Sequence, residues 1–204
     1  MAGQSRQNSS AKSWRVVDIV VTSVLGIAVG IVFWVWSTSW ETLSLPFNAF
    51  PPAAGLLTGV WVLAGVLAGI IIRKPGAALY CEILAAAVSM AFGTQWGWQV
   101  LLSGLIQGIG AELVFLLAGY KFRGSVWNLF LCLFAGLGAG IFLAIGENIL
   151  YNAAWAFTWK LIYTGCAAVS GVVLAGFVSW LAWQSLARTG ALSAFASGHL
   201  GKEI

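Results

Sequence analysis

With 204 residues, of which 60% are apolar and 8% are charged, the chain has a formal net charge of +4. Soluble domains carry roughly 25% charged residues, so this composition excludes a protein whose whole surface faces water. The basic residues are spread over several gaps between apolar segments and form no single face, which argues against nucleic acid as a partner.

Six long apolar segments follow one another, each long enough or nearly so for the roughly 20 residues that cross a bilayer. Nine of the ten basic residues fall in alternate gaps between them, and short loops rich in Lys and Arg stay in the cytoplasm. The pattern therefore predicts that both termini lie inside the cell. The nine residues are Arg6, Lys12, Arg15, Arg73, Lys74, Lys121, Arg123, Arg188 and Lys202.

The predicted fold is an all-α integral membrane protein of the cell membrane, with six transmembrane helices in contact with the lipid bilayer. A cytoplasmic N-terminal tail at 1–15 and a cytoplasmic C-terminal tail at 188–204 flank a transmembrane domain at 16–187. The expected spans are 16–37, 54–72, 76–94, 98–120, 125–150 and 160–187.

The first span carries Gly26 and Gly30, whose spacing puts both on one helical face and lets another helix approach closely. Such pairs most often serve packing inside a bundle. This helix must lie on the perimeter, however, so the pair is a candidate interface with a second membrane subunit. The loop that follows, 37–53, contains three prolines and is expected to resist helix formation and to cover the external face.

Three carboxylates fall inside expected spans, at Glu82, Glu112 and Glu147. Placing a carboxylate near the bilayer centre costs about 3 kcal/mol of free energy, so each of these residues requires a structural or functional explanation. For Glu82 and Glu112 three explanations stay open: a hydrogen bond between helices, recognition of a cationic or amine-bearing ligand, and a proton relay. Glu147 lies near the outer end of the fifth span, where water can solvate it.

Polar and aromatic side chains gather toward the expected outer face. Gln99, Ser103 and Gln107 form one polar stripe on the fourth helix, which suits either an outward-facing cavity or amide bonds between helices. Most outer aromatic residues are explained as an interface belt. Trp61 lies within the second span, where its ring can stack on a flat heterocycle or face a cation. A small, planar, nitrogen-rich solute would match these groups.

Several catalytic and metal-binding motifs are absent from the sequence. It has no phosphate-binding loop of the G-x-x-x-x-G-K-[ST] type, so the chain is not expected to hydrolyse ATP by that route. Its only histidine, His199, lies in the C-terminal tail, and the three cysteines lack metal-ligand spacing. We expect neither an enzyme nor a metal site.

Four strings resemble the YkoE family, which comprises substrate-binding S components of energy-coupling factor (ECF) transporters. The resemblance extends from the first helix to the end of the sixth. It implies a six-helix S component that captures thiamine or its hydroxymethylpyrimidine precursor from outside. The strings are GVW ending at Trp61, RKPGAAL at 73–79 followed by Glu82, QGIGAELVF at 107–115, and ARTGAL at 187–192.

The resemblance also implies partners, namely a coupling transmembrane subunit and two ATPase subunits. The partner subunits would then use ATP, and this chain would need no cofactor of its own. The small-residue face at Gly26 and Gly30 would be available to such a partner. The alternative function is a small channel or proton-coupled carrier in which Glu82 and Glu112 form a relay.

The candidate ligand-binding residues come from two sources. Trp61, Glu82, Gln107 and Glu112 match the family strings, whereas Gln95 and Trp96, in the tight turn GTQWG, rest on position alone. The full set is Trp61, Glu82, Gln95, Trp96, Gln99, Gln107, Glu112, Glu147 and Tyr151.

Overall fold

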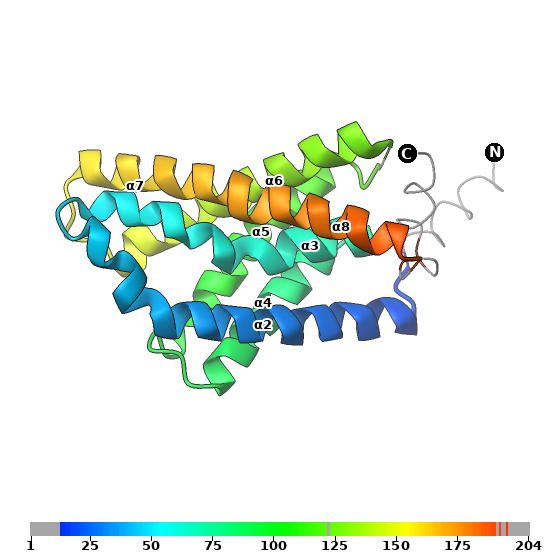
Figure 1. Ribbon diagram of the computed structural model, residues 1–204, viewed down its shortest axis with the longest axis horizontal. Coiled ribbons are helices and arrows are strands. Elements are labelled where there is room, and N and C mark those ends of the chain that lie inside the picture. Colours follow the sequence, from blue (N-terminus) through cyan, green and yellow to red (C-terminus); the bar gives the residue numbers. More distant parts are fainter. Residues whose placement is uncertain (1–12, 122, 191, 193–194, 196–204) are drawn as a thin grey trace.

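The computed structural model describes residues 13–121, 123–190, 192 and 195. Within these residues every regular element is a helix, and the helices form one elongated bundle (Figure 1). Most of the two predicted tails lies outside the described residues, including Arg6, Lys12, His199 and Lys202.

The described residues form six apolar helical segments, which confirms the all-helical prediction. Five are long and apolar enough to cross a membrane, and the third, α4, is shorter at 15 residues. η1 and η2 are 3-10 helices and η3 is a π-helix; η2 continues into α3, and α7, η3 and α8 form one segment. The elements are α2 (Val16–Ser44), η1 (Leu45–Phe47), η2 (Pro51–Val62), α3 (Leu63–Ile72), α4 (Ala77–Ala91), α5 (Gln99–Leu117), α6 (Ser125–Leu150), α7 (Phe157–Ser170), η3 (Gly171–Phe177) and α8 (Val178–Arg188).

The prediction that residues 37–53 resist helix formation is wrong for most of that segment. α2 continues to Ser44, η1 follows with Pro46 in its first turn, and η2 begins at Pro51. A proline in the first turn of a helix costs no hydrogen bond, because the N–H groups there have no partner within the helix. The prolines therefore mark where helices begin, and only residues 48–50 connect η1 to η2.

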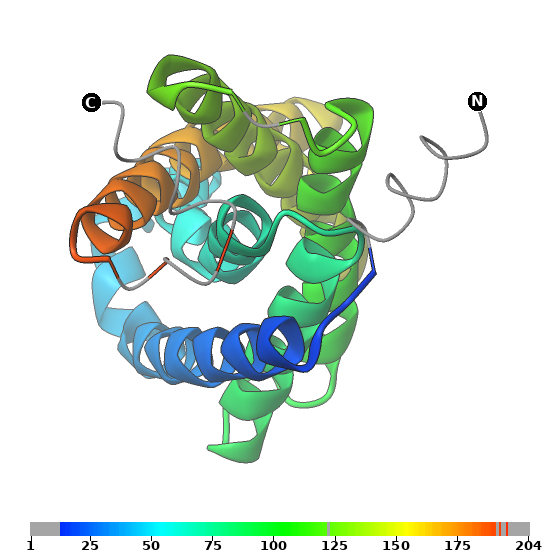
Figure 2. The same cartoon turned by 90° about the vertical axis from the view of Figure 1, so that its right-hand side faces the viewer.

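The segment formed by η2 and α3 runs through the middle of the bundle, where the other helices enclose it (Figure 2). The sequence of α3, LAGVLAGIII, is apolar on every side. A helix without a polar face belongs where all of its sides are covered. Accordingly, every residue from Ala64 to Ile72 is buried.

Gly26 and Gly30 face the inside of the bundle. A Cβ atom at Gly26 would meet the side chain of Leu84, and one at Gly30 would meet Val88, both on α4. The missing side chains let α2 and α4 approach closely. The prediction that this pair forms a partner interface is therefore wrong.

The two ends of the bundle differ in chemistry. At the first, called the basic end, the carboxylate of fully buried Asp18 contacts the Lys74 ammonium at 2.5 Å and the Arg15 guanidinium at 2.9 Å. The indole N–H of Trp14 donates to the carbonyl of Pro75 at 2.9 Å. These bonds fasten the start of α2 to the loop between α3 and α4. The opposite end, called the aromatic end, carries the candidate site.

Candidate ligand-binding site

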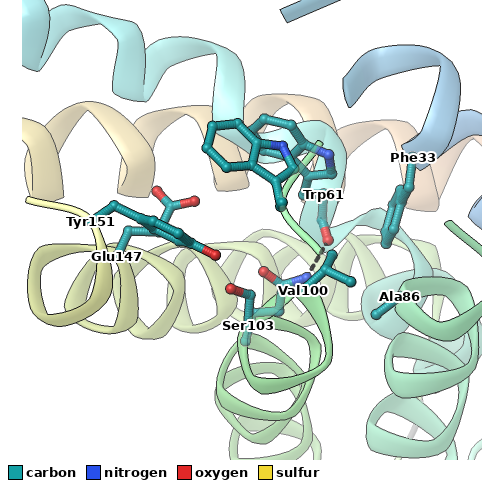
Figure 3. A pocket seen from close by; sticks show the side chains of 9 residues that line it. Phe33, Trp61, Ala86, Val100, Ser103, Glu147 and Tyr151 are labelled. Atoms are coloured by element: carbon teal, nitrogen blue, oxygen red, sulfur yellow. Dashed lines mark hydrogen bonds between the residues drawn. The ribbon is translucent and has the colours of Figure 1, made fainter. Parts of the chain in front are cut away.

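A cavity with two chambers lies at the aromatic end. Its outer chamber has a volume of about 300 Å³ and its inner chamber a volume of about 30 Å³. The chambers adjoin, because both are lined by Trp61, Trp96, Glu147 and Tyr151. The outer chamber is also lined by Trp40, Ser44, Phe47, Asn48, Pro51, Ala54, Asn152, Trp155 and Tyr163, and the inner chamber by Phe33, Ala86, Val100, Ser103 and Gln107 (Figure 3).

Aromatic rings dominate the wall of the outer chamber. The ring centroids of Trp40 and Trp61 are 4.8 Å apart, and those of Trp61 and Trp96 are 6.3 Å apart with nearly perpendicular planes. The ring of Tyr151 follows at 5.4 Å from Trp96. Rings that pack against one another in this way are fixed in position. Their flat faces can stack on a planar ligand, and the negative electrostatic potential of the same faces can attract a cation.

The two indole N–H groups shared by both chambers differ in their partners. Nε1 of Trp61 donates to the hydroxyl of Ser37 at 3.2 Å, which fixes the ring. Nε1 of Trp96 is buried and bonds no group in the described part of the chain. A buried donor without a partner is rare in folded proteins, so the Trp96 N–H is a candidate donor to a ligand.

The inner chamber lies against a break in the central helix. In a continuous α-helix the N–H of Gly65 would donate to the carbonyl of Trp61. Here α-helical bonding begins only with α3, and the Gly65 N–H donates to Oε2 of Glu82 at 2.5 Å. The Trp61 carbonyl accepts from Nε2 of Gln107 at 2.6 Å, the bond that is dashed in Figure 3.

The same Gln107 nitrogen also donates to Oε1 of Glu82 at 2.6 Å. The two side chains therefore span the break between Trp61 and Gly65, and we call them the Gln107–Glu82 bridge. Glu82 is buried behind Gln107 and is absent from the described lining of the cavity. The carboxylate thus satisfies an N–H group of the helix start that has no partner within the helix.

Glu147 places a carboxylate in the wall of both chambers, where the Tyr163 hydroxyl donates to it. Figure 3 shows the Glu147 carboxylate on the same side of the chamber as the hydroxyls of Ser103 and Tyr151, opposite Phe33. Burial raises the pKa of Tyr151 above its ordinary value, so its hydroxyl stays neutral. This side of the cavity can face a cationic or amine-bearing solute.

Four of the nine predicted ligand residues lie away from the cavity lining that the described residues form. Glu82 stands behind Gln107, Gln95 is exposed in the turn between α4 and α5, and Gln99 is half-buried at the start of α5. The fourth, Glu112, lies near the basic end. The other five, Trp61, Trp96, Gln107, Glu147 and Tyr151, line the cavity.

Glu112 is a helix cap instead of a cavity residue. Its carboxylate accepts hydrogen bonds from the backbone N–H groups of Gly76 at 2.6 Å, Ala78 at 3.0 Å and Leu79 at 3.3 Å, and from the Tyr120 hydroxyl. The N–H groups in the first turn of a helix lack partners within it and attract negative charge. The start of α4 therefore explains why an acid lies on this part of α5.

Trp40 is the main cavity residue that the sequence analysis missed, because it was counted with the interface belt. The continuation of α2 to Ser44 brings its ring against Trp61. A signal was present in the sequence: Phe33, Ser37 and Trp40 recur at spacings of four and three residues and share one helical face. All three contact the cavity lining or form part of it.

Comparisons with known proteins agree on the class of protein. Residues 17–142 match a family described as the permease component of an ABC-type cobalt transport system. A Bacillus subtilis (strain 168) protein, YkoE, named as a candidate HMP/thiamine permease, is 36% identical over 95% of this chain and 93% of its own length. A crystal structure of an S-component of an ECF transporter is similar with a TM-score of 0.85 and 34% identity, over 94% of each chain.

Proposed function

The chain belongs to the YkoE family of ECF transporter S components, and we propose that its two-chambered cavity captures thiamine or its hydroxymethylpyrimidine precursor. As a member of that family it is a multi-pass membrane protein and the substrate-capture subunit of a transporter, not an enzyme. What we propose is the identity of the ligand.

The observation that carries this proposal is the combination of aromatic faces and one carboxylate in a single cavity. Thiamine joins an aminopyrimidine ring to a positively charged thiazolium ring. Trp40, Trp61 and Trp96 offer faces on which either ring can stack, and Glu147 offers a charge opposite to that of the thiazolium. The outer chamber, at about 300 Å³, reaches the lower end of the range of 300–1,000 Å³ that is common for small-molecule sites.

Isothermal titration calorimetry of the purified chain in detergent tests the ligand assignment. We expect stoichiometric binding of thiamine, of hydroxymethylpyrimidine, or of both. Biotin, a vitamin without an aromatic ring, is the control and should give no heat of binding. An absence of binding by both pyrimidine compounds would contradict the proposal, because the same preparation can be shown to be folded by its thermal unfolding.

We further propose that the chain works with a coupling transmembrane subunit and two ATPase subunits, which hydrolyse ATP during uptake. Membership of the family supports work with ECF transporter components, and the lack of a phosphate-binding loop in the sequence agrees with ATP use by partner subunits. The alternative of a proton relay through Glu82 and Glu112 gains no support. Both carboxylates accept hydrogen bonds from backbone amides, and the described cavity lining includes neither.

A further inference from the structure

The Gln107–Glu82 bridge holds the amide of Gln107 in one orientation. A backbone carbonyl only accepts hydrogen bonds, so the group that meets the Trp61 carbonyl must be the amide nitrogen and not the amide oxygen. The second hydrogen of that nitrogen is directed to Oε1 of Glu82 at 2.6 Å. Both hydrogens of the amide are therefore engaged in the break of the central helix.

The oxygen of Gln107 is consequently the polar group that this residue can offer to the inner chamber, which it lines. No described residue donates a hydrogen bond to this oxygen. A partly desolvated acceptor without a partner is energetically unfavourable. The chamber is thus suited to a hydrogen-bond donor.

The size of the inner chamber limits which donor can enter. Its volume of about 30 Å³ is enough to hold a water molecule or a group of that size. An exocyclic amino group is of that size. A ring in the outer chamber can therefore place one small substituent into the inner chamber.

From these observations we infer that Gln107 recognises an amino group on the ligand ring through its side-chain oxygen. Glu82 acts as a positioning residue that holds the Gln107 amide in the required orientation. This inference rests on the proposed function and adds a chemical selectivity to it. The site selects rings that carry an amino group at the inner end over rings that carry an oxo group there. An oxo group would place two acceptors against each other.

The first test compares the affinities of the purified wild-type chain for thiamine and for its 4-oxo analogue, in which an oxo group replaces the amino group and the neighbouring ring nitrogen carries a hydrogen. We expect the oxo compound to bind about 10–100-fold more weakly, because two acceptors face each other. Equal affinities would overturn the inference and leave the proposed function intact. Failure of thiamine and hydroxymethylpyrimidine to bind at all would instead overturn the proposed function.

The second test asks whether Glu82 sets this selectivity. In the variant Glu82→Gln, the new amide can donate to the Gln107 oxygen, so the Trp61 carbonyl alone still favours the wild-type orientation of the Gln107 amide. We expect the ratio of the two affinities to fall toward one. A purely structural loss would weaken both ligands alike and leave the ratio unchanged, and that result would remove Glu82 from its positioning role.

Glu112→Gln is the matched control, because Glu112 is also a carboxylate bonded to backbone N–H groups and lies outside the cavity lining. Its affinity ratio should equal that of the wild type.

Gly65→Ala gives a second route to the same question if Glu82→Gln does not fold. A Cβ atom at Gly65 would lie 3.0 Å from Oε2 of Glu82, so it displaces the carboxylate without removing it. The affinity ratio should fall in this variant too, and an unchanged ratio would contradict the positioning role.

Discussion

Two tryptophans that line the same cavity differ in the use of their N–H groups. Trp61 donates to Ser37, behind the cavity wall, whereas Trp96 is buried without a bonding partner in the described part of the chain. Composition and spacing could identify both as aromatic residues near the outer end. They could not show which N–H is engaged, because that depends on Ser37 of α2 reaching across to η2.

The exchange Trp96→Phe keeps an aromatic face and removes the N–H donor. We expect thiamine affinity, measured by calorimetry, to fall about threefold to tenfold through the loss of one hydrogen bond. Trp61→Phe is the comparison, since its N–H group is already bonded within the protein. It should weaken binding less than Trp96→Phe, and an equal or greater loss would argue against a ligand bond to Trp96.

At the scale of elements, the positions of the six apolar segments could be predicted because apolar length and loop charge are properties of the sequence itself. Apolar length and loop charge were not enough to predict which residues form the candidate site. Glu82 and Glu112 lie on neighbouring helices and both fall inside apolar segments of the sequence, but Glu82 bonds to the first turn of α3, at the break between η2 and α3, and Glu112 caps α4. The break occurs where the 3-10 helix η2 becomes α-helical, and no residue type in GVWVLAG marks that change.

Glycines set how closely α6 and the last segment approach each other. A Cβ atom at Gly171 would collide with the backbone carbonyl of Gly136 on α6, which cannot move aside. We expect Gly171→Ala to lower the free energy of unfolding by about 1–3 kcal/mol, as overpacking does in other cores. Denaturant unfolding of the purified chain in detergent measures this.

Gly165→Ala is the control in the same segment, because a Cβ atom there meets no atom within 4 Å. It should leave stability unchanged or raise it by up to about 1 kcal/mol, since alanine has the higher helix propensity. Equal destabilisation by both exchanges would show that close approach at Gly171 does not limit stability.

At the scale of the whole molecule, the Asp18 ion-pair cluster and the aromatic-walled cavity lie at opposite ends of the bundle. Arg15 and Lys74 meet buried Asp18 at the basic end, and the cavity lies at the aromatic end. The distribution of basic residues predicts that the basic end faces the cytoplasm. The cavity would then receive its ligand from outside the cell.

Labelling of single introduced cysteines by a membrane-impermeant maleimide tests this orientation. Ala49 is exposed next to the cavity, and Thr189 is exposed at the end of α8 near the basic end. We expect Ala49→Cys to react in intact cells and Thr189→Cys to react only after the membrane is made permeable. The wild-type chain, with Cys81 and Cys132 buried and Cys166 half-buried in α7, is the background control. The reverse pattern would show the opposite orientation.

The shortness of α4 has a consequence for the surrounding lipid. Its 15 residues span about 22 Å, whereas the hydrocarbon core of a bilayer is about 30 Å thick. The turn after it exposes Phe92 and Trp98, aromatic residues of the kind that settle at the level of lipid headgroups. A bilayer meets such a mismatch by thinning locally. We therefore expect the bilayer to be thinner beside α4 than around the rest of the protein. A change in the acyl-chain length of the lipids should alter the fit between protein and bilayer at α4 first.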